Sequence, residues 1–112
     1  WLNLPEHRLD AAGAVSGSGP AYFFEIMENL VRGAVRLGLP WAEARRLVIN
    51  TALGSALMAK KMETSALADL RDMVTSPGGT TAEALYVFEK GGLGGLVQKA
   101  LEAATRKSRE LV

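Results

Sequence analysis

The chain has 112 residues, of which 48% are hydrophobic and 22% charged, and its formal net charge is +1. These values are typical of one globular domain and exclude a disordered chain. The absence of Cys excludes disulfides, thiolate catalysis and Cys-ligated zinc, and a single His cannot build a His-rich metal site, so we expect no bound metal. Basic and acidic residues alternate along the sequence, which predicts a solvated surface rather than one that binds nucleic acid.

No apolar run reaches the ~18 residues of a membrane span, so no membrane partner is expected. The N-terminus lacks the basic segment and apolar core of a signal peptide, and we therefore expect a soluble, cytoplasmic protein. Because the chain begins at Trp1 without an initiator Met, we expect it to be a piece of a longer protein. His7 is expected at the surface of an extended N-terminal segment.

The first long helix is predicted from about Pro20 to Leu37. Ser18 or Gly19 can cap it, and Pro is favoured in a first helical turn, where its missing N–H would be unpaired anyway. Gly38 ends the helix and Pro40 blocks its continuation. Its apolar residues recur at helical spacing and form one stripe: Phe23, Ile26, Met27, Leu30, Val31, Ala34 and Leu37.

A second long helix is predicted from about Trp41 to Met62, and its second half is apolar on every face. Between Leu47 and Ala59 the only polar side chains are Asn50, Thr51 and Ser55. A helix of this kind must be covered all round, either within one chain or by a second subunit. We expect the second subunit, because a chain of this size has difficulty surrounding a central helix and small residues here (Ala52, Gly54, Ser55, Ala56) permit close approach.

Three more helices are predicted over about residues 65–73, 80–90 and 93–111. The first would point Leu67, Leu70 and Val74 inward. The second would open with a capping box in which Thr80 and Glu83 bond each other's backbone. The last would bury Leu96, Val97, Ala100, Leu101 and Ala104. Because strand patterns are nearly absent, the fold class is an all-α bundle of about five to six helices, in one domain over residues 1–112.

The segment Thr75-Ser76-Pro77-Gly78-Gly79-Thr80-Thr81 is the most informative stretch for chemistry. Two glycines before a helix let successive N–H groups point at one spot, and the helix dipole adds positive potential there. Such a loop is a plausible seat for a carboxylate or phosphate. The alternative, favoured by the physics of the loop alone, is a tight turn before a well-capped helix with no ligand.

A second Gly-rich segment, Ser16-Gly17-Ser18-Gly19-Pro20, also precedes a helix. It matches neither dinucleotide-binding nor P-loop spacing, and no strand comes before it. A flexible entry into a closely packed helix is therefore favoured over a phosphate cradle.

Several of these segments together resemble one family. The central run continues from Leu67-x-x-Leu70-x-x-x-Val74 through the loop to Ala84-Leu85-x-x-Phe88-Glu89, which resembles the signature of pyrroline-5-carboxylate reductase. The similarity spans about Asp10 to Leu111 and includes Ser16 to Tyr22, Arg36 to Pro40 and Gly91-Gly92. The chain departs from the family pattern at Thr64 to Leu67, where many members have an acidic His-Pro turn, and at Met73, where a polar or basic residue is common.

The resemblance implies an enzyme that makes proline by reducing 1-pyrroline-5-carboxylate with NADPH or NADH. The chain would be its C-terminal domain, with a fold like that of the 6-phosphogluconate dehydrogenase C-terminal domain. This domain interlocks into homodimers, and many members assemble five dimers into a decamer. The cofactor, NADP or NAD, would be bound mainly by an N-terminal Rossmann domain that is absent from this chain. The chain alone is expected to be inactive.

The resemblance also assigns residues. Ser76, Gly78, Gly79, Thr80 and Thr81 would bind the substrate carboxylate, and the Thr81 hydroxyl would act catalytically beside the ring nitrogen. Ser18, Gly19 and Pro20 would lie near the nicotinamide. Two other hypotheses remain: a free-standing helical dimerisation module without catalysis, and the helical domain of a related dehydrogenase that acts on another small acid.

Overall fold

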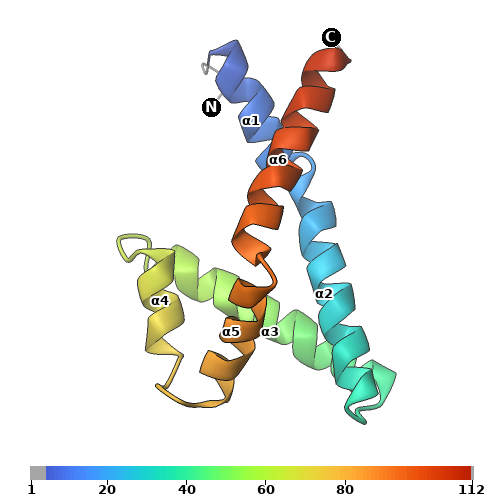
Figure 1. Cartoon of the computed structure of the whole chain (residues 1–112), viewed down its shortest axis with the longest axis vertical. Helices are drawn as coiled ribbons and strands as arrows, with labels where there is room; N and C mark the ends of the chain where they lie inside the picture. Colours follow the sequence, from blue (N-terminus) through green and yellow to red (C-terminus); the bar gives the residue numbers. More distant parts are fainter. Residues whose placement is uncertain (1–4, 112) are drawn as a thin grey trace. The chain divides into compact units, whose positions relative to one another are not determined.

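The computed structural model describes residues 5–111, apart from the side chains of Glu6 and His7. This part of the chain consists of six α-helices and contains no strand, so the all-α class is confirmed (Figure 1). The helices are α1 (Glu6–Ser16), α2 (Gly19–Arg36), α3 (Trp41–Lys61), α4 (Leu67–Met73), α5 (Thr80–Lys90) and α6 (Leu93–Glu110).

Helix α1 corrects the expected extended N-terminal segment, because His7 lies inside a helix. The N–H groups of Arg8 and Leu9 donate to the Pro5 carbonyl oxygen at 2.9 and 3.0 Å, so the helix starts directly after Pro5. Its sequence has no apolar stripe from which periodicity could predict it. Packing against another helix therefore supplies the stability that local pattern does not.

The chain divides into two compact units. Unit 1 combines residues 5–23 with 86–111, and unit 2 comprises residues 24–85. In unit 1, α1 packs against α6. The Ser108 hydroxyl donates to one oxygen of the half-buried Asp10 carboxylate at 3.1 Å, and Arg109 Nε lies 3.6 Å from the other oxygen. A polar clamp thus fixes α1 along the C-terminal half of α6.

The buried core of the described chain is very small. Its buried hydrophobic residues are Ala14, Val31, Ala44 and Leu70. Leu67, Leu70 and Val74 were all expected to point inward. Leu70 is buried as expected, but Leu67 and Val74 are exposed, which corrects the expectation for these two residues. On α6, Leu96, Val97 and Ala100 are likewise exposed, while Leu101 and Ala104 are half-buried. The apolar stripes of α4 and α6 exist as predicted, but the helices of their own units leave most of these side chains exposed.

Helix α3 shows the same pattern. Leu47, Leu53 and Leu57 are all exposed, and Ala44 is its buried residue. No helix of unit 2 therefore encloses the apolar half of α3.

The surface area of the chain supports the same conclusion. It exposes 9256 Å². A compact monomeric protein of 11.9 kDa exposes about 6,000 Å², and even two separate compact bodies of half that mass would expose only about 7,000 Å². The excess is area that a compact fold would bury, and the many exposed large hydrophobic side chains contribute to it.

Candidate functional site

The loop between α4 and α5 is fixed at its start by Thr75. Its hydroxyl donates to the Arg71 carbonyl oxygen at 2.6 Å, and its N–H donates to the Asp72 carbonyl oxygen at 3.1 Å. Both acceptors belong to the last turn of α4, whose final carbonyls have no helical partner. Thr75 therefore closes the C-terminal end of α4 and sets the direction in which the loop leaves it.

The loop then makes a tight turn over Ser76-Pro77-Gly78-Gly79. The Gly79 N–H donates to the Ser76 carbonyl oxygen at 3.0 Å, and Gly78 has φ +70°. Pro at the second position and a positive φ at the third are the pattern of a type II β-turn. A Cβ on Gly79 would lie 3.2 Å from the Ser76 oxygen. Gly78 is therefore required for its positive φ, and Gly79 because a side chain would crowd the Ser76 carbonyl oxygen.

Helix α5 begins immediately after this turn, with Thr80 as its first residue. The Glu83 N–H donates to the Gly79 carbonyl oxygen at 3.2 Å. No backbone carbonyl in the described part of the chain accepts a bond from the N–H groups of Thr80, Thr81 or Ala82. Thr80 and Thr81 are exposed, so three adjacent donors at a helix N-terminus face accessible space.

The predicted capping box is not formed. Thr80 is the first helical residue, so the cap position falls to Gly79, whose carbonyl receives the Glu83 N–H. With Gly79 in that place, no side chain occupies the cap position. The donors that a Ser or Thr cap would have satisfied stay available for a ligand.

The electrostatics of this loop come from its backbone. Residues 75–82 contain no charged side chain, and the nearby Arg71 is paired with Asp72 at 3.2 Å. Positive potential at the site is supplied by the free N–H groups and the dipole of α5. Within residues 5–111, no group of three or more His, Asp or Glu side chains could hold a metal ion.

The predicted site residues fall into two places. Ser76, Gly78, Gly79, Thr80 and Thr81 are brought together in the α4–α5 loop of unit 2. Ser18, Gly19 and Pro20 form the α1–α2 junction of unit 1.

The backbone groups of the α1–α2 junction are mostly engaged in hydrogen bonds with nearby residues. The Ser18 N–H donates to the Gly13 carbonyl oxygen at 3.1 Å, and the Ser18 carbonyl accepts the Ala21 N–H at 3.1 Å. Gly19 is buried, whereas Ser18 and Pro20 are exposed. The junction is a packed entry into α2 with two exposed side chains.

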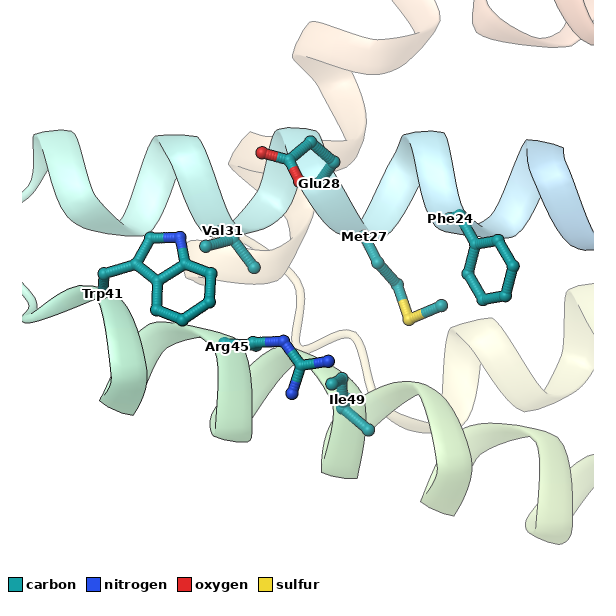
Figure 2. Close-up of a pocket in the computed structure, with 7 residues that line it drawn as sticks. All are labelled: Phe24, Met27, Glu28, Val31, Trp41, Arg45 and Ile49. Atoms are coloured by element: carbon teal, nitrogen blue, oxygen red, sulfur yellow. The ribbon is translucent and has the colours of Figure 1, made fainter.

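Two features of the structure were not predicted from the sequence. One is a groove in unit 2 between α2 and α3, lined by the seven side chains drawn in Figure 2. The other is the Tyr22 hydroxyl, which is buried and has no hydrogen-bond partner among the described residues. The groove could have been found by comparing positions 24, 27, 28 and 31 with positions 41, 45 and 49. The Tyr22 burial has no signal in the sequence.

Comparisons with known proteins agree with this fold. The sequence model of the pyrroline-5-carboxylate reductase dimerisation family matches residues 6–111. A pyrroline-5-carboxylate reductase of Pseudomonas aeruginosa is 48% identical over 99% of the chain and 40% of its own length. One of Synechocystis is 44% identical over 98% of the chain and 41% of its own length. The chain thus spans about two fifths of these curated relatives.

Solved structures give the same result. A pyrroline-5-carboxylate reductase from Coxiella burnetii superposes with a TM-score of 0.92 at 46% identity, over 96% of this chain and 40% of its own. The Plasmodium falciparum pyrroline carboxylate reductase, solved with NADP bound, has a TM-score of 0.90 at 39% identity, over 96% and 40%.

The fold and its uncovered apolar faces define an all-helical domain of the kind that associates with other subunits. The chain belongs to the pyrroline-5-carboxylate reductase dimerisation family, which confirms the resemblance seen in the sequence. None of the described helices is both long and apolar enough to cross a membrane.

Proposed function

We propose that residues 1–112 form the C-terminal dimerisation and substrate-binding domain of a pyrroline-5-carboxylate reductase in the cytoplasm. That enzyme reduces 1-pyrroline-5-carboxylate to L-proline with NADPH or NADH. Family membership over residues 6–111 supports the assignment, and the chain covers about two fifths of its relatives' length, as one domain of such an enzyme would. The chain alone is predicted to be inactive as a reductase, because no strand of a nucleotide-binding sheet occurs among its described residues.

The observation that carries this proposal is the set of three free N–H groups at Thr80, Thr81 and Ala82. A substrate carboxylate seated there would accept hydrogen bonds from fixed donors, each of which contributes about 1.5–3 kcal/mol when its acceptor is charged. Gly78 and Gly79 shape the turn that presents these donors, and Ser76 anchors the turn through its carbonyl. A rigid clamp on the carboxylate would hold the ring in one orientation for hydride transfer.

Thr81 is the proposed catalytic residue. Thr81 is exposed in the first turn of α5, beside the free N–H groups, and its hydroxyl takes part in none of the side-chain hydrogen bonds of the described residues. With the carboxylate bound in the loop, this hydroxyl would reach the ring nitrogen or a water beside it. It would then take part in the transfer of the proton on that nitrogen. A protonated imine is a good hydride acceptor, so little further acid–base chemistry is required.

The bound cofactor would supply the hydride, and this chain would contribute to its site only at one end. Ser18, Gly19 and Pro20 are the proposed contacts. Because the Ser18 N–H is already bonded to Gly13 and Gly19 is buried, the contacts would come from the Ser18 hydroxyl and the Pro20 ring. NADP is bound in the related Plasmodium falciparum structure. The choice between NADPH and NADH stays open.

The proposed partner is a second copy of this chain. The uncovered area exceeds the roughly 800 Å² per partner that a stable interface needs, by a factor of two or more. A protomer of an obligate dimer does not form a complete core by itself, so a single copy exposes apolar faces of this kind. Assembly of five dimers into a decamer stays a prediction.

The test is the substitution Thr81→Ala in the complete enzyme. We expect kcat/KM for 1-pyrroline-5-carboxylate to fall at least tenfold while the dimer persists in sedimentation, because the loss of a hydrogen bond to a charged group costs about 1.5–3 kcal/mol. The matched control is Thr81→Ser, which keeps the hydroxyl and should retain most activity. Wild-type kinetics in Thr81→Ala would remove Thr81 from the mechanism.

A further inference from the structure

The polar clamp between α1 and α6 engages both oxygens of one carboxylate. Ser108 Oγ donates to Asp10 Oδ1 at 3.1 Å, and Arg109 Nε lies 3.6 Å from Asp10 Oδ2. The Asp10 side chain is only 18% exposed, whereas every other ion pair of the described residues joins two side chains that are more than half exposed. Among the side-chain hydrogen bonds of residues 5–111, the bond from Ser108 to Asp10 is the one that joins two helices.

Apolar packing does not fix the position of α1 along α6 by itself. Ala14 is the buried hydrophobic residue of α1, while Leu9 and Val15 are exposed. Apolar contact is also non-directional, so a small buried side chain specifies no single position along its neighbour. The helix has 11 residues and no side-chain hydrogen bond at its N-cap, which makes it marginal in isolation. The position of α1 therefore depends on the directional contacts of the polar clamp.

The clamp fixes both the rotation and the axial position of the helices, because its two α6 residues are consecutive. Ser108 and Arg109 project about 100° apart around the axis of α6, so one carboxylate meets both side chains only at one rotation of that helix. A shift of α1 by one residue moves Asp10 by about 1.5 Å along the axis, which lengthens and misaligns the bond from Ser108.

Hydrogen bonds connect the clamped part of α1 directly to the α1–α2 junction. Gly13 lies one turn after Asp10 on α1. Its carbonyl oxygen accepts the N–H of Gly17 at 2.8 Å and the N–H of Ser18 at 3.1 Å. A Cβ on Gly17 would lie 2.9 Å from that oxygen, so the backbone is tightly packed at this turn. A displacement of α1 at Asp10 is therefore carried to Ser18.

We propose that Asp10, Ser108 and Arg109 are positioning residues that hold the α1–α2 junction in place for contact with the nicotinamide end of the cofactor. The inference rests on the proposed function, in which the exposed Ser18 and Pro20 make that contact. All of these residues lie in unit 1, whereas the loop proposed to bind the substrate carboxylate lies in unit 2. Loss of the clamp should therefore weaken cofactor binding and leave substrate binding nearly unchanged.

Hydrogen exchange measures the effect of the clamp on the junction without any ligand. Asp10→Ala removes the carboxylate and places a strong helix former in α1, so the helix can persist. In the complete enzyme without cofactor, we expect exchange in residues 12–18 to become about tenfold faster, with circular dichroism unchanged. Glu110→Gln is the matched control, because it removes the exposed Lys107–Glu110 pair of α6 and leaves the clamp intact. Exchange at the control rate in Asp10→Ala would overturn the inference.

Cofactor binding is measured by fluorescence titration with NADPH and with NADH, which requires no turnover. We expect Asp10→Ala to raise the dissociation constant of the cofactor about fivefold to tenfold, while KM for 1-pyrroline-5-carboxylate and the sedimentation of the enzyme stay at their control values. Ser108→Ala should raise the dissociation constant less, because Arg109 still contacts the carboxylate, and Ser108→Thr should restore it. The double variant should bind the cofactor no more weakly than Asp10→Ala alone, because both changes remove the same contact.

A further variant separates this inference from the proposed function. Ser18→Ala tests the proposed cofactor contact directly. If Ser18→Ala weakens cofactor binding and Asp10→Ala does not, the contact stands and the positioning role is overturned. If neither variant changes cofactor binding, the contact and the positioning role both fail. An equal rise in the cofactor dissociation constant and in KM for 1-pyrroline-5-carboxylate would also overturn the positioning role, because the clamp would then support the fold as a whole.

Discussion

The α4–α5 loop and the long helix α3 lie in the same unit, but the interactions that the loop needs are present within the chain and those that would cover α3 are not. The loop satisfies its own geometry: Thr75 bonds back to α4, Gly78 and Gly79 close the turn, and α5 starts at once. Helix α3 has regular backbone bonds, but Leu47, Leu53 and Leu57 remain exposed. The proposed anion seat is thus encoded within about ten consecutive residues, whereas we expect the core of the domain to be completed by a second copy.

The strongest way to break this comparison is a charge on α3. Leu53→Glu would place a carboxylate in the surface that we expect the second copy to cover. An uncompensated buried charge costs about 3–5 kcal/mol, which raises the dimer dissociation constant by about a hundredfold to several thousandfold. Sedimentation equilibrium should therefore show a monomer at micromolar concentration.

Lys60→Glu is the matched control for Leu53→Glu, because it changes charge at an exposed polar position of the same helix. It should leave the dimer largely intact. If Leu53→Glu dimerised as tightly as the control, the apolar half of α3 would lie outside the interface.

The seat can be tested by the removal of a single donor. Thr80→Pro deletes one free N–H at the first helical position, where Pro is compatible with the helix. In the complete enzyme we expect KM for 1-pyrroline-5-carboxylate to rise about tenfold to a hundredfold, the equivalent of one hydrogen bond to a charged group. Thr80→Ala keeps the N–H and should change KM little. Equal KM values for the two variants would argue against a carboxylate at this position.

A smaller effect is expected at Thr75, which touches no ligand in the proposal but positions the loop. Thr75→Val keeps the size of the side chain and removes its 2.6 Å bond to the Arg71 carbonyl. We expect a loss of about 1 kcal/mol in the free energy of unfolding, with KM raised several-fold and kcat nearly unchanged. Thr75→Ser should restore both values. A fall in kcat at constant KM would instead assign Thr75 a direct role in the reaction.

Helices were predicted well from the sequence where residues that start or stop a helix lie at their ends. The bounds Thr80–Lys90 of α5 were predicted at both ends, because Gly78-Gly79 precede the helix and Gly91-Gly92 follow it. Helix α1 was missed, since its only strong determinants are Pro5 and contacts with α6 that lie about a hundred residues away in the sequence. Long-range packing of this kind leaves no periodic signal.

Predicting which faces are apolar was also easier than predicting what covers them. Leu67, Val74, Leu96 and Val97 do form apolar stripes, but periodicity cannot distinguish a face buried in one chain from a face buried between copies. At the site, the loop was found from its glycines and its helix start. The prediction that Thr80 caps α5 was wrong, because the helix starts at Thr80 itself and the cap position falls one residue earlier, to Gly79.

The smallest expected effect concerns the Tyr22 hydroxyl, which is buried without a hydrogen-bond partner in the described chain. Because the atom is already inaccessible in a single copy, a second copy cannot reach it without rearrangement. Tyr22→Phe removes an unsatisfied polar group and should raise the free energy of unfolding by about 1 kcal/mol. Thermal unfolding of the assembled protein measures this difference. A lower melting temperature would mean that assembly supplies a partner to the hydroxyl, so that the α1–α2 junction, like α3, is completed only by another copy.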